Sequence, residues 1–365
     1  MSSSEITACF KQLPGAGFPA GMMEQTVQLY QHDAFFHLAL AKNRRRKHLQ
    51  ETFADVRPEK VWISNNLRHL TPRGIGLPCG YLERGYFSQE RAATANGELA
   101  RSIVIVNNND LHQGGDPAGF VAVFNACPET IFVVWDWDNH HWLGLSVPLA
   151  AHSDLYAPTH HENHFLLSRY AVNITDSVAA GVAQWTAPFL EQHRGELVSA
   201  ERSDQPLGKH IPYGPFQYRN RVVATLSPHF ASIGFSSHQF HEMTELQKMQ
   251  EWAAHKSHWI VPVLNDIPIR VFDALVTGGI PLIPDTLRFT HWLADAHRDD
   301  VLYYAADDIV QPAGLAARAC ELFDRHGESG IIRRHEYAMD RHHGDVRLAS
   351  MLDAAATLYG FLWRE

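Results

Sequence analysis

The sequence predicts an α/β protein made of two consecutive domains, each a parallel sheet covered by helices. The chain has 365 residues, about twice what one hydrophobic core usually organises. Short apolar runs alternate with stretches that suit amphipathic helices, as in successive βαβ units. The runs are apolar at consecutive positions, which is typical of strands that a parallel sheet buries on both faces.

The first domain is predicted from strands at 60–66, 101–110, 130–138 and 153–159, with helices at 114–127 and 140–152. The residues before 60 have a helical character. A polar stretch at 191–209 interrupts the alternation, and we interpret it as the connection between the domains. The predicted boundaries are therefore 1–200 for the first domain and 201–344 for the second.

The second domain repeats the alternation, with strands at 208–214, 230–236, 258–264, 280–283 and 299–305 and helices at 218–227, 244–256, 268–277 and 313–327. Gly327 would end the last of these helices, because glycine readily adopts the left-handed conformation found there. Apolar residues at helical spacing between Leu348 and Leu362 predict a final amphipathic helix, assigned to residues 345–365.

Charge and cysteine usage narrow the class of protein. The formal net charge of −9 disfavours a nucleic-acid-binding protein, which needs surplus Lys and Arg. The four cysteines form no C-x-x-C pair, which favours a reduced, cytoplasmic compartment. The first residues lack the pattern of a signal peptide, and no apolar run is long enough to predict a membrane span. Peripheral contact with the inner face of the membrane stays open.

Several motifs of other α/β proteins are missing from the sequence. No G-x-G-x-x-G follows the first strand, which disfavours a dinucleotide oxidoreductase, and no G-x-x-x-x-G-K-[ST] phosphate loop is present. The G-x-S-x-G pattern of α/β-hydrolases is also absent.

The segment 267–287, IPIRVFDALVTGGIPLIPDTL, contains the best-defined candidate site. It is predicted to follow a strand with a turn, a helix and a second strand, and parallel sheets bind ligands at the carboxyl ends of strands. Arg270 would add a planar cation to an anion-attracting helix N-terminus, which suits phosphate. Asp273, one turn later, could accept hydrogen bonds from a sugar. The alternative is an ordinary surface pair at i, i+3.

The part of this segment that reads RVFDALVTGGIPLIPD resembles the C-terminal signature of GT-B-fold glycosyltransferases, especially the exostosin-like and spore-maturation-like groups. The matching positions are Arg270, Phe272, Ala274, Leu275, Gly278, Pro281 and Leu282, and a looser resemblance extends over about 208–330. The resemblance implies two facing Rossmann-like domains, with a nucleotide sugar bound mainly by the second. It also implies a terminal helix that packs back toward the first domain, and a donor held without a divalent ion.

The resemblance assigns roles to individual residues. Arg270 would neutralise the leaving phosphate and Asp273 would hold the ribose. Further contacts to the donor are expected from Lys209 or Arg219, as a second positive charge, and from Ser236 and Ser237, as hydrogen-bond donors. Many retaining members carry two glutamates eight residues apart. This chain has Asp273 at the second position but Asn265 at the first, so the ribose role transfers and the retaining chemistry does not.

The first domain is expected to supply the acceptor side. Polar clusters follow two of its predicted strands, and the candidates for a general base are Asp138 first, then Asp110, His112 and His140. An acceptor hydroxyl has a pKa far above 7, so a carboxylate or imidazole must take its proton as the new bond forms. The alternative is that these residues merely cap the next helices.

The 24 histidines include dense stretches at 160–164, 238–242 and 333–343. A metal site needs side chains that converge, and the sequence contains no H-E-x-x-H motif. We therefore expect no metal and no cofactor other than the nucleotide-sugar substrate.

The sequence thus favours a glycosyltransferase that moves a sugar from a nucleotide donor to a glycan or lipid-linked acceptor. Two alternatives stay open: a nucleotide-sugar 2-epimerase of the same fold, and a non-catalytic protein that binds sugar or nucleotide. UDP, GDP and CMP donors are not distinguished, nor are retention and inversion or the oligomeric state.

Overall fold

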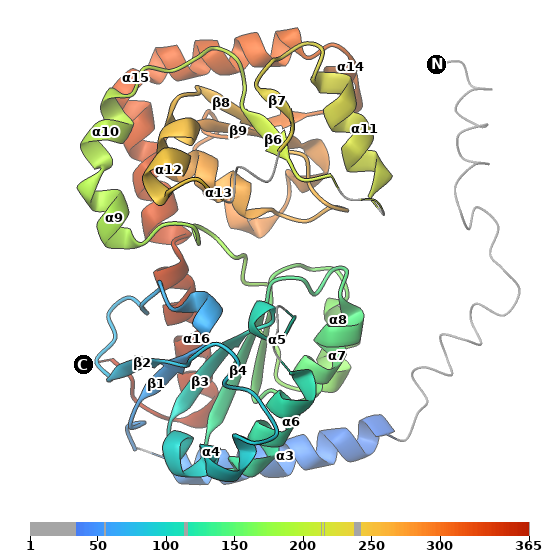
Figure 1. Ribbon diagram of the computed structural model, residues 1–365, viewed down its shortest axis with the longest axis vertical. Helices are drawn as coiled ribbons and strands as arrows, with labels where there is room; N and C mark the ends of the chain where they lie inside the picture. The colour runs from blue at the N-terminus through green and yellow to red at the C-terminus, as the bar shows by residue number, and fades with distance from the viewer. Residues whose placement is uncertain are drawn as a thin grey trace, which may run out of the picture.

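The computed structural model describes residues 34–54, 56–112, 116–212, 214, 216–236 and 242–364. Two α/β domains lie one above the other, and the chain crosses between them twice (Figure 1). Within the described ranges, no helix combines the length and the apolar character needed to cross a membrane.

The first domain has a sheet of five parallel strands in the order β2-β1-β3-β4-β5. The strands are β1 (Val61–Ile63), β2 (Cys79–Tyr81), β3 (Ile103–Asn107), β4 (Ile131–Asp136) and β5 (Leu155–Pro158). Four of them lie inside the predicted runs. β2 was not predicted, because its three residues are at most half-buried and form no apolar run.

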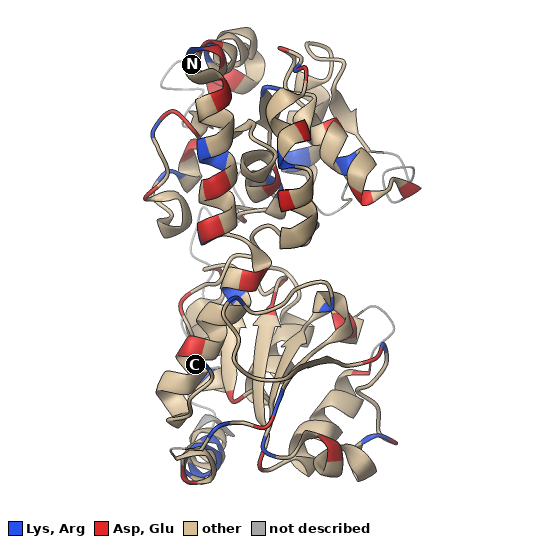
Figure 2. Ribbon diagram, turned by 90° about the vertical axis from the view of Figure 1, so that its left-hand side faces the viewer, with Lys and Arg blue, Asp and Glu red and all other residues tan. Residues whose placement is uncertain are grey.

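Helices cover both faces of this sheet, as the continuous apolar strands predict. Side chains alternate along β3: Ile103 and Ile105 face one core with α3, whereas Val104 and Val106 face the other. Figure 2 shows the central strands of this domain without charged residues along most of their length. The helices are α3 (Ala34–Phe53), α4 (Ala92–Leu99), α5 (Asn109–His112), α6 (Pro117–Ala126), α7 (Leu143–Ala151) and α8 (His164–Ala171).

The second domain repeats the same strand order. A pair, β6 (Gly208–His210) and β7 (Ile233–Phe235), lies beside the three-stranded sheet of β8 (Ser257–Trp259), β9 (Ile280–Pro284) and β10 (Leu302–Tyr304). A parallel bridge between Leu207 and His258 joins β6 to β8. The order is therefore β7-β6-β8-β9-β10, with every pairing parallel.

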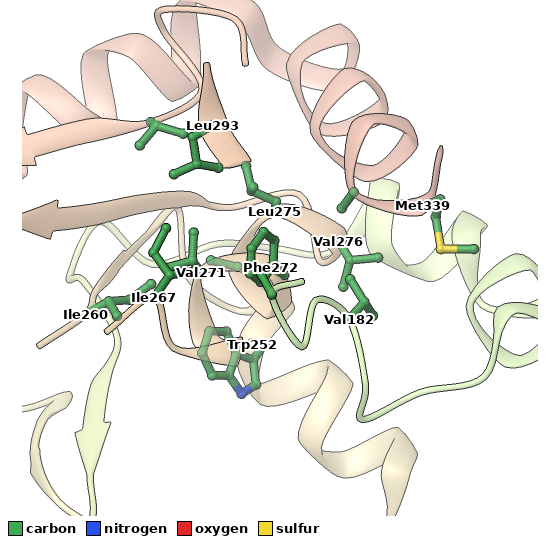
Figure 3. Close-up of a cluster of buried hydrophobic side chains, with 14 of the residues drawn as sticks. Val182, Trp252, Ile260, Ile267, Val271, Phe272, Leu275, Val276, Leu293 and Met339 are labelled. Atoms are coloured by element: carbon green, nitrogen blue, oxygen red, sulfur yellow. The ribbon is translucent and has the colours of Figure 1, made fainter. Parts of the chain in front are cut away.

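The second domain begins earlier in the chain than residue 200. Helices α9 (Ala187–Gln192) and α10 (Arg194–Ser199) contribute Leu190 and Leu197 to the core around α13 (Ile269–Val276). Phe272, Leu275 and Val276 of α13 point into this cluster (Figure 3). The polar stretch that suggested a connection therefore contains short amphipathic helices. The remaining helices are α11 (Gln217–Leu226), α12 (Glu245–Ala253), α14 (Ala306–Val310) and α15 (Ala313–Arg341).

The end of the chain returns to the first domain. α15 is interrupted at Gly327, which has a φ of 49°, so the helix expected to end there resumes after a kink. α16 (Gly344–Tyr359) then packs Leu348, Met351 and Leu352 against the first sheet, as predicted (Figure 1). This is the GT-B architecture: two Rossmann-like domains and a C-terminal helix that crosses back.

The two crossings between the domains pair with each other. The Val182 amide donates to the His342 carbonyl at 2.8 Å, and the Gly344 amide donates to the Val182 carbonyl at 2.9 Å. Gly181 has a φ of 69°, and a Cβ there would lie 1.9 Å from the His342 carbonyl oxygen. A glycine is required at this close approach, so the two crossings form one compact connection.

Candidate functional site

A cleft of about 310 Å³ lies between the domains. The first domain lines it with the loop that follows β5, at His160, His161 and Glu162. The second domain lines it with residues that follow β8 and β9: Asn265, Ile267, Leu287, Thr290 and Trp292. The carboxyl ends of both parallel sheets therefore open on the same cleft, where α/β proteins bind their ligands.

Asp138 follows β4 and is partly accessible, with 22% of its side chain exposed. The Asn108 amide donates to its Oδ2 at 2.7 Å, and Asn108 Oδ1 accepts from the Trp137 backbone at 2.8 Å. Burial raises the pKa of Asp138, although the Asn108 hydrogen bond and the nearby His112 ring oppose that shift. A fixed, reachable carboxylate with a raised pKa is well suited to accept a proton.

Asp110 and His112 make structural contacts on α5. Both Asp110 carboxylate oxygens accept from the Asn66 backbone, at 2.9 and 3.1 Å, which holds the turn that follows β1. Burial raises the pKa of Asp110, against the lowering effects of Ser64, Asn66 and Arg84. The His112 ring lies against Trp142 with centroids 3.9 Å apart. The Asp110 contacts are structural, but they hold the turn after β1 and do not cap the helix that follows its own strand.

His140 is buried, with 8% of its surface exposed. Its Nε2 lies 2.9 Å from His141 Nδ1, and its ring centroid lies 4.1 Å from that of His160. Burial, helped by the neighbouring histidines, lowers the pKa of His140 to about 2. The imidazole is therefore neutral at physiological pH.

The second domain has a pocket at the ends of β6 and β7 beside the first turn of α13. Lys209, Ser236 and Arg270 line it together with Glu251 and Trp252. Arg270 is the second residue of α13 after the N-cap Pro268, as the sequence predicted to within one residue. Lys209 Nζ lies 2.6 Å from Glu251 Oε1, so this carboxylate partly offsets the charge of the lysine.

Arg219 and Asn265, also expected on the donor side, do not line this pocket, whereas Ser236 does. Arg219 is buried, and its Nη2 lies 3.1 Å from Nδ1 of His210. Asn265 Oδ1 accepts from Thr286 Oγ1 at 2.7 Å and lines the cleft between the domains. Ser236 donates its backbone N–H to His210 at 2.9 Å. Ser237 lies outside the described residues.

Asp273 is completely buried on α13. The Gln184 amide donates to its Oδ2, while Oδ1 has no hydrogen-bond partner. Burial raises its pKa to about 7, and the Gln184 hydrogen bond and the Arg270 charge oppose this shift. In this conformation the carboxylate joins α13 to the segment that connects the domains.

Residues that the sequence-based site did not include also lie at the carboxyl edges. His160 and Glu162 follow β5, Asp266 follows β8, and Gln184 comes from the connecting segment. The rule that selected Asp138 also applies to His160 and Asp266, since each comes soon after a predicted strand. Gln184 has no such signal, because its position depends on how the two domains meet.

Comparisons with known proteins give likenesses of fold only. No family model matches the chain, and no curated protein matches it. Among solved structures, HepE from Anabaena in complex with UDP is 9% identical, with a TM-score of 0.48 over 82% of this chain and 99% of that chain. A UDP-forming α,α-trehalose-phosphate synthase from Burkholderia xenovorans is 9% identical, with a TM-score of 0.47 over 81% and 98%.

A second trehalose-phosphate synthase, from Burkholderia vietnamiensis, is 10% identical, with a TM-score of 0.44 over 73% of this chain and 76% of that chain. Identities this low and TM-scores below 0.5 do not transfer an activity to this chain. The finer resemblance to the exostosin-like and spore-maturation-like groups stays an expectation.

Proposed function

We propose that this chain is a glycosyltransferase of the GT-B type, which transfers a sugar from a nucleotide donor to an acceptor hydroxyl. The observation that carries the proposal is the different side-chain chemistry at the carboxyl edges of the two sheets. The second domain offers a pocket with Lys209 and Arg270, and the first offers the accessible carboxylate of Asp138. A cationic pocket suits the donor phosphates, and a carboxylate suits the proton of the acceptor.

Arg270 is proposed to bind the phosphate that leaves with the nucleotide. As the bond between the anomeric carbon and the phosphate oxygen breaks, negative charge builds on that oxygen. A guanidinium at the N-terminus of α13 combines a permanent charge with the positive end of the helix dipole. Both interactions grow stronger in the transition state, which is the condition for catalysis rather than mere binding.

Asp138 is proposed to be the general base. The acceptor oxygen forms the new bond to the anomeric carbon, its proton passes to the Asp138 carboxylate, and the nucleotide departs with the electron pair of the broken bond. The hydrogen bond from Asn108 holds the carboxylate in place. We propose a glycan or lipid-linked acceptor, as the resemblance in sequence implies.

Asp273 is proposed to hold the ribose, after its contact with Gln184 has opened. The carboxylate is buried, so the ribose hydroxyls would take the place of the Gln184 amide. Both donors are neutral and meet the same carboxylate, so the exchange itself is even. The gain would come from a second ribose hydroxyl that donates to Oδ1, which has no hydrogen-bond partner. Donor binding would then loosen one contact between α13 and the connecting segment.

The proposal is tested by following the full chain with nucleotides and nucleotide sugars. A thermal-shift panel of UDP, GDP, TDP, ADP and CMP should show one clear responder, because a ligand of the folded state raises the melting temperature. The matching nucleotide sugar is then incubated with and without glycan acceptors, and the products are identified by NMR. A new glycoside supports the proposal. An epimer formed without acceptor would instead establish the 2-epimerase, and binding without turnover a non-catalytic protein.

A further inference from the structure

Three buried side chains from both domains converge at the edge of the interdomain cleft. His140 follows β4, His160 follows β5 and Asp266 follows β8. Their exposed fractions are 8%, 4% and 8%. One nitrogen or oxygen atom from each lies within 4.8 Å of the other two. Burial of this kind is unusual for three polar groups unless they share a partner.

Each residue has an atom with no hydrogen-bond partner: Nδ1 of His140, Nδ1 of His160 and Oδ1 of Asp266. His160 Nε2 lies 3.0 Å from the Trp137 carbonyl, which can only accept, so Nε2 carries the proton and Nδ1 has a free lone pair. An unmade hydrogen bond at a buried group costs about 1–3 kcal/mol. His160 Nδ1 and Asp266 Oδ1 can both accept, and a cation bound among the three side chains would satisfy them.

The ionisation of these groups also suits a cation. Burial is the main cause that lowers the pKa of His140 to about 2 and that of His160 to about 3, so both rings are neutral, which is the ligating form. Burial raises the pKa of Asp266 to about 7, with Glu162 adding to the rise and Arg219 and Arg270 opposing it. A bound cation would restore the ionised carboxylate.

The loops that carry the two histidines are held together before any ligand binds. Asn139 is fully buried, and its amide donates to the carbonyls of His160 and Glu162, both at 2.8 Å. Its Oδ1 accepts from the His160 backbone at 2.8 Å. Supporting hydrogen bonds of this kind, together with the Trp137 contact to His160, orient ligands in metal sites.

We propose that His140, His160 and Asp266 bind one divalent transition-metal ion that links the two domains across the cleft. Two imidazoles and a carboxylate suit zinc or ferrous iron, and three protein ligands leave a position for water or another group. The proposal does not depend on the glycosyltransferase function. It also differs from the sequence-based expectation of no metal. The sequence alone does not show that residues from different domains converge.

A second group, His161, Asp176 and His291, has the same ligand types within 4.8 Å but is exposed. It provides a matched control, since exposed groups of this kind are common without an ion. His291→Gln should leave tight binding unchanged if the buried group is the site.

The experiment measures zinc binding to the full chain after treatment with EDTA and removal of the chelator. The parent should take up one zinc ion tightly, as measured by calorimetry against a competing chelator and by elemental analysis. His160→Gln and Asp266→Asn should each lower the affinity by about 100-fold or more, since changes to supporting residues alone cost 10–100-fold. Cobalt in place of zinc should give visible absorption bands that both variants lose.

Asp266→Asn also separates a metal ligand from a merely structural residue. The asparagine keeps the shape and removes a buried charge, so the stripped variant should melt at or above the temperature of the stripped parent. With zinc present, the parent should gain stability and the variant should not. Equal zinc affinity in the parent and both buried variants, or no tight zinc in the parent, would overturn the proposal.

Discussion

The two domains have the same strand order but opposite chemistry at their carboxyl edges. In the first, Asn107 and Asn108 are buried. The Asn107 amide donates a hydrogen bond to the Trp135 carbonyl, and the Asn108 amide donates one to the Asp138 carboxylate. In the second, Lys209 and Arg270 line the pocket that faces the start of α13. The apolar strands decide the architecture, and the residues that follow each strand decide what the edge can bind. The first edge presents the carboxylate of Asp138, and the second presents the cations Lys209 and Arg270.

Asp138→Asn should have the largest effect on turnover. An asparagine keeps the shape but cannot take the acceptor proton, so the transfer rate should fall by about 10²–10⁴-fold. Nucleotide affinity should stay near the parental value, because the pocket for the nucleotide is proposed in the other domain. Calorimetric titration beside turnover checks both expectations. Asp324→Asn, at an exposed ion pair with Lys256, is the control. Parental turnover in Asp138→Asn would remove Asp138 as the base.

Arg270→Ala should lower turnover by about 10²–10³-fold, with a smaller loss of nucleotide affinity, because the charge that it meets is greatest in the transition state. Arg270→Lys should recover only part of the rate, since an ammonium cannot hold two oxygens in one plane. Steady-state rates and calorimetry on the three proteins decide the matter. A folded alanine variant with the parental rate would show that the phosphate binds elsewhere.

Asp273→Asn should raise stability at neutral and higher pH. The folded-state pKa of Asp273 is about 7, above its usual value of 3.8, so the parent is stabilised by the protonated form and loses that contribution as the pH rises from about 4 to 7. The variant does not titrate there. A pKa shift of this size corresponds to about 4 kcal/mol in the parent's free energy of unfolding, lost as the pH rises through this range.

Urea unfolding at pH 5 and pH 8 measures this effect, and the stability advantage of the variant should be larger at pH 8. The proposed ribose contact predicts that the same variant binds nucleotide more weakly. A variant with the parental nucleotide affinity would confine Asp273 to its structural contact with Gln184.

The sequence predicted most of the fold because the deciding signals are local. The apolar runs gave β3 and β4 directly, and the residues of α13 have helical spacing as well as a proline at the N-cap. The sequence did not predict β2, because a strand of three partly exposed residues is defined only by its pairing with β1. The sequence predicted which residues follow each strand, but not which residues of the two domains meet. The Gln184–Asp273 contact joins residues 89 positions apart, and the convergence of His160 with Asp266 depends on how the domains meet.

The Lys209–Glu251 pair should give the smallest effect and the finest test of the cationic edge. Lys209 Nζ and Glu251 Oε1 lie 2.6 Å apart with the lysine about half exposed, so the pair contributes little to stability. Glu251→Gln should leave Lys209 its full charge and raise nucleotide affinity by about two- to fivefold at low salt, an effect that added salt should weaken. Lys209→Met should lower affinity by about tenfold, the loss of one charge-assisted hydrogen bond. Calorimetry at two salt concentrations separates these outcomes. If both variants shift affinity in the same direction, the pair supports the pocket through packing and the charge of Lys209 does not reach the ligand.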